Sequence, residues 1–168
     1  MDAIEQNVEI PAGGVALEAE IAVPVPAWGM VLLVQGESPD HDQSRIGDVA
    51  GALQEAGLAT TLLGLLGDAD EWIDASGERV VAVIDWLVEH EYAPGPDIGL
   101  FGTGPGAAAA LIAATARPLV AAIVACGDRR DLAAEWLRQV RQPTLLIAGD
   151  EVEVARFTRD WFVRHLRR

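Results

Sequence analysis

The sequence predicts an α/β fold, in which helices cover a doubly wound and mostly parallel β-sheet. Strand-length runs of apolar residues recur along the chain, and segments with helical periodicity separate them. A strand that is apolar at every position is buried on both faces, as in a parallel sheet between two layers of helices. The regular alternation of strands and helices indicates a single domain, which we place at residues 1–168.

The chain opens with two short alternating runs, VEI (8–10) and VALEAEIAV (15–23), which flank the turn signal PAGG. This pattern predicts a β-hairpin. Five apolar runs of strand length then follow, and we expect them to form the rest of the sheet. They are MVLLVQG (30–36), ATTLLG (59–64), DIGLFG (97–102), VAAIVACG (120–127) and TLLIAG (144–149).

Apolar residues at helical spacing predict five helices between and after these strands. The first two are expected to follow N-caps at Ser44 and Ser76, and an alanine-rich third helix follows Gly106. A shorter fourth helix carries Leu132, Trp136 and Val140. The stripe of the last helix is expected to consist of Val154, Phe157, Trp161 and His165, with Phe162 and Leu166 beside it.

Composition excludes several classes of function. The net charge is −14 and all 12 basic residues are arginine, which disfavours nucleic acid and anionic membranes as partners. The single Cys126 excludes an intrachain disulfide and makes a cysteine-based zinc site unfavourable. No metal or cofactor is therefore expected. No apolar run approaches a membrane span, and the N-terminus lacks a signal core, so we expect a cytoplasmic protein.

Three glycines mark the point at which a strand is expected to run into a helix, in LFGTGPGAAAA (100–110). Enzymes that place a nucleophile on a sharp strand-to-helix turn use the pattern G-x-S-x-G there. This chain has Gly104 at the serine position, followed by Pro105. A phosphate-binding loop of the G-x-G-x-x-G type is the rival interpretation. It is less favoured because the glycine spacing is short by one and Pro105 lacks an N–H.

The order of these segments resembles that of an α/β-hydrolase, and most closely the small dienelactone-hydrolase-like proteins. The resemblance extends over nearly the whole chain. It is carried by EIPAGGVALEAEIAVP, GALQEAGLAT, VVAVIDWL, GTGPGAAAAL and RQPTLLIAGDE, in that order.

The resemblance implies a catalytic machinery that this chain does not reproduce. Gly104 stands at the nucleophile position, and Pro105 stands where an oxyanion N–H is expected. The other oxyanion turn reads Gln35-Gly36-Glu37, and Asp150 stands at the acid position. The family's last strand and histidine loop are expected to be deleted, because GD (149–150) runs directly into a segment that resembles the final helix. On that helix His165 is expected to be a packing residue.

We therefore expect a degenerate, non-catalytic α/β-hydrolase-like protein that binds a small molecule or a protein partner. In an open α/β sheet, ligands bind at the carboxyl ends of the strands. The binding residues predicted on this ground are Gln35, Gly36, Glu37, Gly104, Pro105 and Cys126. The alternative is an active hydrolase of small ester or lactone-type substrates, which would use Cys126 or a water held by Glu37.

The lost strand also predicts an assembly. Without it, the apolar strand TLLIAG becomes an open sheet edge, which proteins cover or pair. We expect this edge and the final helix to form a two-fold homodimer. The alternative is a monomer in which the final helix folds back over its own edge.

Overall fold

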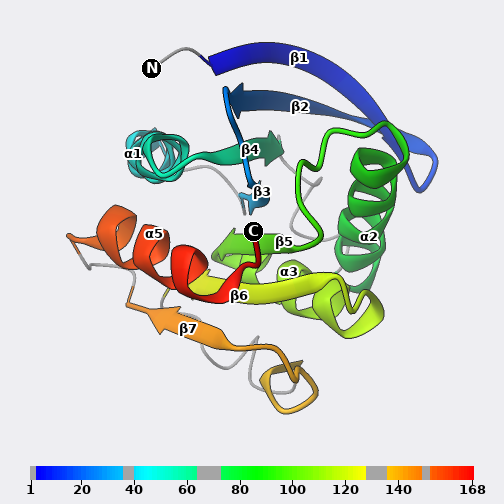
Figure 1. The fold of residues 1–168 in the computed structure, drawn as a ribbon. Helices are drawn as coiled ribbons and strands as arrows, with labels where there is room; N and C mark the ends of the chain where they lie inside the picture. The colour runs from blue at the N-terminus through cyan, green and yellow to red at the C-terminus, as the bar shows by residue number, and fades with distance from the viewer. Residues whose placement is uncertain (1–2, 36–39, 64–72, 128–135, 149–151) are drawn as a thin grey trace.

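The computed structural model describes residues 3–35, 40–63, 73–127, 136–148 and 152–168 (Figure 1). After an N-terminal hairpin, strands and helices alternate in this part of the chain as far as Cys126, and a further strand and a final helix follow. In chain order they are β1 (Ala3–Ala12), β2 (Val15–Pro24), β3 (Gly29–Val34), α1 (Asp40–Glu55), β4 (Leu58–Leu63), α2 (Ile73–Glu89), β5 (Ile98–Thr103), α3 (Pro105–Ala116), β6 (Val120–Cys126), β7 (Thr144–Ile147) and α5 (Val154–His165).

The strands form one seven-stranded sheet in the order β1-β2-β4-β3-β5-β6-β7. The β1–β2 hairpin is antiparallel, and β2 also runs antiparallel to β4. All the pairs from β4 to β7 are parallel. The predicted α/β fold, with its hairpin and its mostly parallel sheet, is confirmed. The hairpin is longer than its alternating sequence suggested, because β1 pairs with β2 along its entire length.

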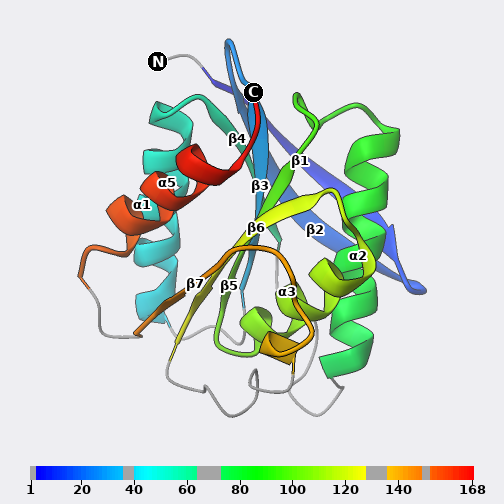
Figure 2. The same ribbon diagram turned by 60° about the horizontal axis from the view of Figure 1, so that its bottom comes forward.

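Helices cover both faces of the sheet: α1 and α5 pack together on one face, and α2 and α3 on the other (Figures 1 and 2). The side chains of β3 alternate between two cores. Met30 and Leu32 belong to the core under α2 and α3, whereas Val31 and Leu33 belong to the core under α1 and α5. Every residue of β3 is buried, which is why the strand is apolar throughout.

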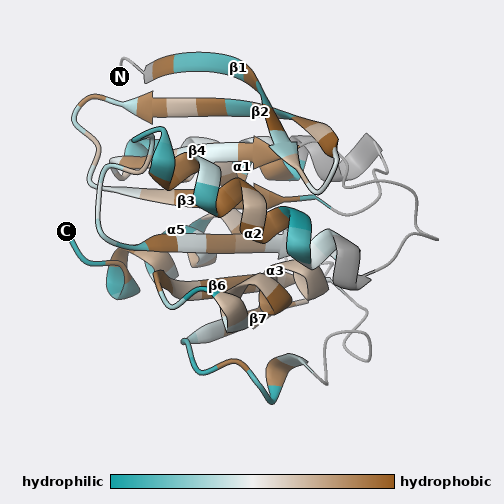
Figure 3. Ribbon diagram, turned by 90° about the vertical axis from the view of Figure 1, so that its right-hand side faces the viewer, coloured by the Kyte–Doolittle hydropathy of each residue, from teal (hydrophilic) through white to brown (hydrophobic). Residues whose placement is uncertain are grey.

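The hairpin has only one buried face. In β2 the side chains of Leu17, Ala19 and Ile21 are buried, and the residues between them are exposed. Figure 3 shows hydrophilic residues interspersed with hydrophobic ones along both hairpin strands. In the part of the chain that the structure describes, no helix is both long and apolar enough to cross a membrane.

Both expected N-caps were wrong. α1 begins at Asp40 and α2 at Ile73, so Ser44 and Ser76 lie inside these helices. The prediction began each helix where its apolar periodicity begins, but the first turn of a helix need not contribute to the core. The expected fourth helix falls largely outside the described residues; of its apolar positions, Trp136 is helical.

The buried stripe of α5 was also misassigned. The buried residues of this helix are Val154, Thr158 and Phe162. Phe162 takes the central place because Gly99 of β5 leaves room for its ring: a Cβ built on Gly99 would lie 2.5 Å from Phe162 Cε1. Phe157 is only partly buried and flanks this stripe.

The residues after α5 are tied to the opposite end of the sheet from the strand-to-helix turn at Gly104. The buried carboxylate of Asp97 accepts hydrogen bonds from Arg167 N and Arg167 Nη2, both at 2.8 Å. The hydrogen bonds from Arg167 lower the pKa of Asp97. The guanidinium of Arg168 lies 4.3 Å from the ring centroid of Trp28. These contacts hold α5 across the face of the sheet.

Candidate functional site: the turn between β5 and α3

Gly104 forms the turn between β5 and α3 and has φ 55° and ψ −128°. Its N–H donates to the carbonyl of Cys126 at 3.1 Å, and its own carbonyl accepts from Ala107 N at 3.0 Å. A Cβ built on Gly104 would meet no described atom within 4 Å. The turn thus has a backbone conformation that side chains rarely adopt, and open space where a side chain would project. A strained residue at the tip of a strand-to-helix turn is the arrangement of a nucleophile elbow, and Gly104 at this tip has no side chain that could act as a nucleophile.

Gly102 and Pro105 shape the same turn. A Cβ on Gly102 would lie 2.6 Å from both Ala107 Cα and the Gly106 carbonyl oxygen, so the first turn of α3 rests directly on the end of β5. Pro105 is the first residue of α3, a position whose N–H has no partner within the helix. Because proline has no N–H, the residue after the nucleophile position cannot donate to an oxyanion.

Cys126 ends β6 beside this turn, and its side chain is only 3% exposed. Arg45 of α1 places Nη1 3.9 Å from Cys126 Sγ. Sequence reasoning missed this cation because 81 residues separate the two side chains, which only the packing of α1 on the sheet brings together. A nearby cation favours the thiolate, whereas burial disfavours it and restricts access.

Gln35 follows β3 and lines a different feature, a cavity of about 760 Å³ at the carboxyl ends of β3 and β4. The hairpin contributes Glu9, Glu18 and Glu20 to its wall, and α1 contributes Gly47. The described lining includes neither the elbow nor Cys126. Of the predicted binding residues that the structure describes, Gln35 lines this cavity, whereas Gly104, Pro105 and Cys126 lie at the turn that follows β5, the strand paired with β3.

The remaining predicted site residues are placed as follows. Gly36, Glu37 and Asp150 lie outside the described residues. His165 is partly buried on α5, with its ring centroid 4.2 Å from that of Trp161. Its Nε2 is buried and has no hydrogen-bond partner among the described residues. The same residues include no group of three His, Cys, Asp or Glu that could hold a metal.

Comparison with known proteins gives two kinds of match. The chain is 34% identical, over 158 residues, to two Mycobacterium tuberculosis proteins, each from a different strain and named "Putative phosphoribosyl transferase". The alignment covers 89% of this chain but only 36% of those proteins, so the chain spans about a third of their length. No protein-family model matches the chain.

Solved structures match over the full fold. Dienelactone hydrolase from Anabaena variabilis has a TM-score of 0.81 and 25% identity, and the match covers 99% of this chain and 100% of that one. A cold-adapted esterase from an Arctic intertidal metagenomic library has a TM-score of 0.74 and 14% identity, with 99% and 96% covered. The resemblance inferred from the sequence is thus confirmed: the chain is an α/β-hydrolase-fold protein that is similar to dienelactone hydrolase.

Proposed function

We propose that this chain is a non-catalytic α/β-hydrolase-like protein whose fold serves to bind a small molecule or a protein partner. The elbow is the observation that carries the proposal. Gly104 offers no group that can attack an acyl carbon, and Pro105 offers no N–H to an oxyanion. Acyl transfer by this fold depends on both functions. The loss of both in adjacent residues indicates that the chemistry has been abandoned.

The connection from β7 to α5 supports the same conclusion. The resemblance implies a strand and a histidine loop between the acid and the final helix. Here only residues 148–153 separate β7 from α5, too few for those elements. α5 packs beside α1 on one face of the sheet, and its own His165 contacts Trp161. His90 lies at the end of α2 and stacks on Trp86, and the side chain of His41 lies outside the described residues.

The cavity beside Gln35 is the proposed small-molecule site. Its volume of about 760 Å³ is in the range of ordinary ligand pockets. The glutamates of its wall favour a cationic or hydrogen-bond-donating ligand over an anionic one. The name of the mycobacterial relatives describes whole proteins, and this chain matches only about a third of their length. The match of the whole chain to dienelactone hydrolase supports a hydrolase-derived role for this part.

Hydrolysis of p-nitrophenyl acetate and butyrate tests the absence of catalysis. We expect no turnover above the rate in buffer, either for the chain itself or for Gly104→Ser, which still has Pro105 and lacks a base. Turnover that is proportional to protein concentration and persists through successive purification steps would contradict the proposal.

One observation favours the alternative, a hydrolase that uses Cys126. The contact between Arg45 Nη1 and Cys126 Sγ is the kind of surrounding that activates a thiol. Incubation with the same esters, followed by mass spectrometry, tests it. Because the thiol is 3% exposed, we expect no acyl adduct. An adduct that disappears in Cys126→Ala and weakens in Arg45→Gln would establish the alternative. The other proposed group, a water held by Glu37, lies outside the described residues.

The cavity is tested with a matched pair of variants on α1. Gly47 lines the cavity and Gly51 does not, and a Cβ on either residue meets no described atom within 4 Å. A screen of fragment-sized cations and anions by amide chemical shifts should show cations binding near Gln35. Gly47→Phe should abolish those shifts, whereas Gly51→Phe should retain them. Equal binding by both variants would place the ligand site elsewhere.

A further inference from the structure

The strand β7 forms one edge of the sheet in the described part of the chain. It pairs with β6 on one side, and no other described strand pairs with its outer edge. The side chain of Leu146 is 49% exposed on this strand. Residues 145–148 carry no charge that would discourage another strand from pairing. Among the described residues this edge is therefore unpaired, and it is apolar.

A groove of about 630 Å³ lies between this edge and α5. We call it the β7–α5 groove; besides residues 145–148, it is lined by Phe157, Asp160, Trp161 and Arg164. Successive positions in this group of four are three, one and three residues apart, so they form a single stripe along α5. The stripe of Val154, Thr158 and Phe162 already faces the core. The groove stripe lies beside it: Phe157 and Trp161 are partly buried against the same core, whereas Asp160 and Arg164 are exposed.

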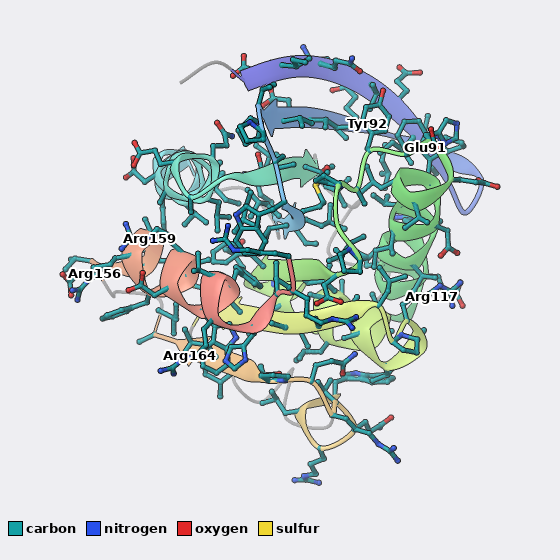
Figure 4. All side chains as sticks on the ribbon, viewed as in Figure 1. Glu91, Tyr92, Arg117, Arg156, Arg159 and Arg164 are labelled. Atoms are coloured by element: carbon teal, nitrogen blue, oxygen red, sulfur yellow. The ribbon has the colours of Figure 1, made fainter. Side chains whose placement is uncertain are left out.

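The groove stripe carries one acidic and one basic residue, which makes it complementary to itself. The Asp160 side chain is 62% exposed and pairs only with its neighbour Arg159, at 2.9 Å, among the described residues. Figure 4 shows the labelled Arg164 on the side of α5 toward β7, and Arg156 at the far end of the helix. If two copies of α5 lie antiparallel about a two-fold axis near residue 162, Asp160 of each faces Arg164 of the other. The contact then occurs twice.

We propose that the β7–α5 groove is occupied by a second copy of this chain, related by a two-fold axis. The same axis places the open edge of β7 antiparallel to the edge of its copy, so that the unpaired backbone groups can bond. An isologous interface requires a surface that is complementary to itself, and the order of the two charges on α5 meets that requirement. The proposal does not depend on whether the chain is catalytic.

Light scattering at micromolar concentration gives the first test. We expect a mass of about 36 kDa, twice the 17.8 kDa of the chain. A mass near 17.8 kDa would overturn the proposal, because it would show that the edge and groove remain open or are covered within one copy.

Charge reversal tests the surface and the symmetry together. Arg164→Glu places Glu opposite Asp160 in a pair of identical copies, and Asp160→Arg places two arginines opposite each other. Each variant alone should therefore have the mass of a monomer. A mixture of the two should regain the mass of a dimer, because both contacts are then between opposite charges. Ionic contacts within one chain cannot produce this recovery on mixing.

Arg156→Glu is the matched control, because it makes the same charge change on the same helix but outside the groove. Arg156 pairs instead with Glu153. The control should remain dimeric. Circular dichroism of every variant verifies that it is folded. Leu146→Lys is a second kind of variant that should disrupt the dimer, because it places a charge on the β7 side of the interface. A dimer that survives both reversals, or single variants that stay monomeric when mixed, would refute the proposed surface.

Discussion

Replacement of Gly104 by serine is the sharpest test of the elbow, because it restores the family's residue and tests the backbone at once. At φ 55° and ψ −128°, Gly104 lies outside the left-handed region that other residues can enter. Such strain costs about 1–3 kcal/mol for a residue with a side chain. No steric cost is added, since a Cβ meets no described atom within 4 Å. Because serine has less conformational freedom than glycine in the unfolded chain, the substitution also stabilises the folded state by about 0.4–1 kcal/mol, which offsets part of this cost.

The expected net loss of unfolding free energy for Gly104→Ser is therefore at most about 2.6 kcal/mol, and about 1.3 kcal/mol at the middle of the two ranges. For a domain of this size, each kcal/mol lowers the melting temperature by about 2–4 °C. Urea denaturation and calorimetry of the variant beside the parent measure both quantities. Two control substitutions separate the backbone strain at Gly104 from the general effect of replacing a glycine.

Gly14→Ser changes another glycine that has open space and a positive φ of 84°, so it should also destabilise. Gly47→Ala changes a glycine in α1 with open space and no positive φ. It should raise stability by up to about 1 kcal/mol, because alanine is the better helix former. If Gly104→Ser proved as stable as the parent while Gly14→Ser lost stability, the turn would not carry the strain of an elbow.

Two further predictions concern the packing of α5. Gly99→Ala should lower the unfolding free energy by about 1–3 kcal/mol, because its Cβ would lie 2.5 Å from the Phe162 ring. Urea denaturation should show a smaller loss when the same substitution is made in a Phe162→Leu background. An equal loss in both backgrounds would mean that the ring is not the obstacle. Asp97→Asn should destabilise at pH 7, because Arg167 lowers the pKa of Asp97 from its ordinary value of 3.8. This contribution is present above about pH 4 and is lost as the pH falls through the lowered pKa, so the difference between parent and variant should shrink in acid. A difference that stayed constant from pH 7 to pH 3 would contradict this assignment.

Local signals in the sequence were sufficient for the fold and for the position of the turn between β5 and α3. Apolar runs such as that of β3 predicted a sheet buried on both faces, and PAGG predicted the hairpin turn. The position of Gly104 between a strand and a helix followed from its immediate neighbours, and the structure places it in that turn. Both inferences concern residues close together in the chain, where the backbone conformation and the burial of a segment determine which residue types it contains.

Contacts between distant segments were decided only by the tertiary structure. The buried face of α5 depends on a glycine in β5 that admits the Phe162 ring, which the periodicity of the helix cannot show. The contact of Arg45 with Cys126, and the lining of the cavity by Gln35 and the hairpin, likewise depend on how helices and strands pack. A helix sequence records how much apolar surface it carries, but the partner across the interface determines which part of that surface becomes the core.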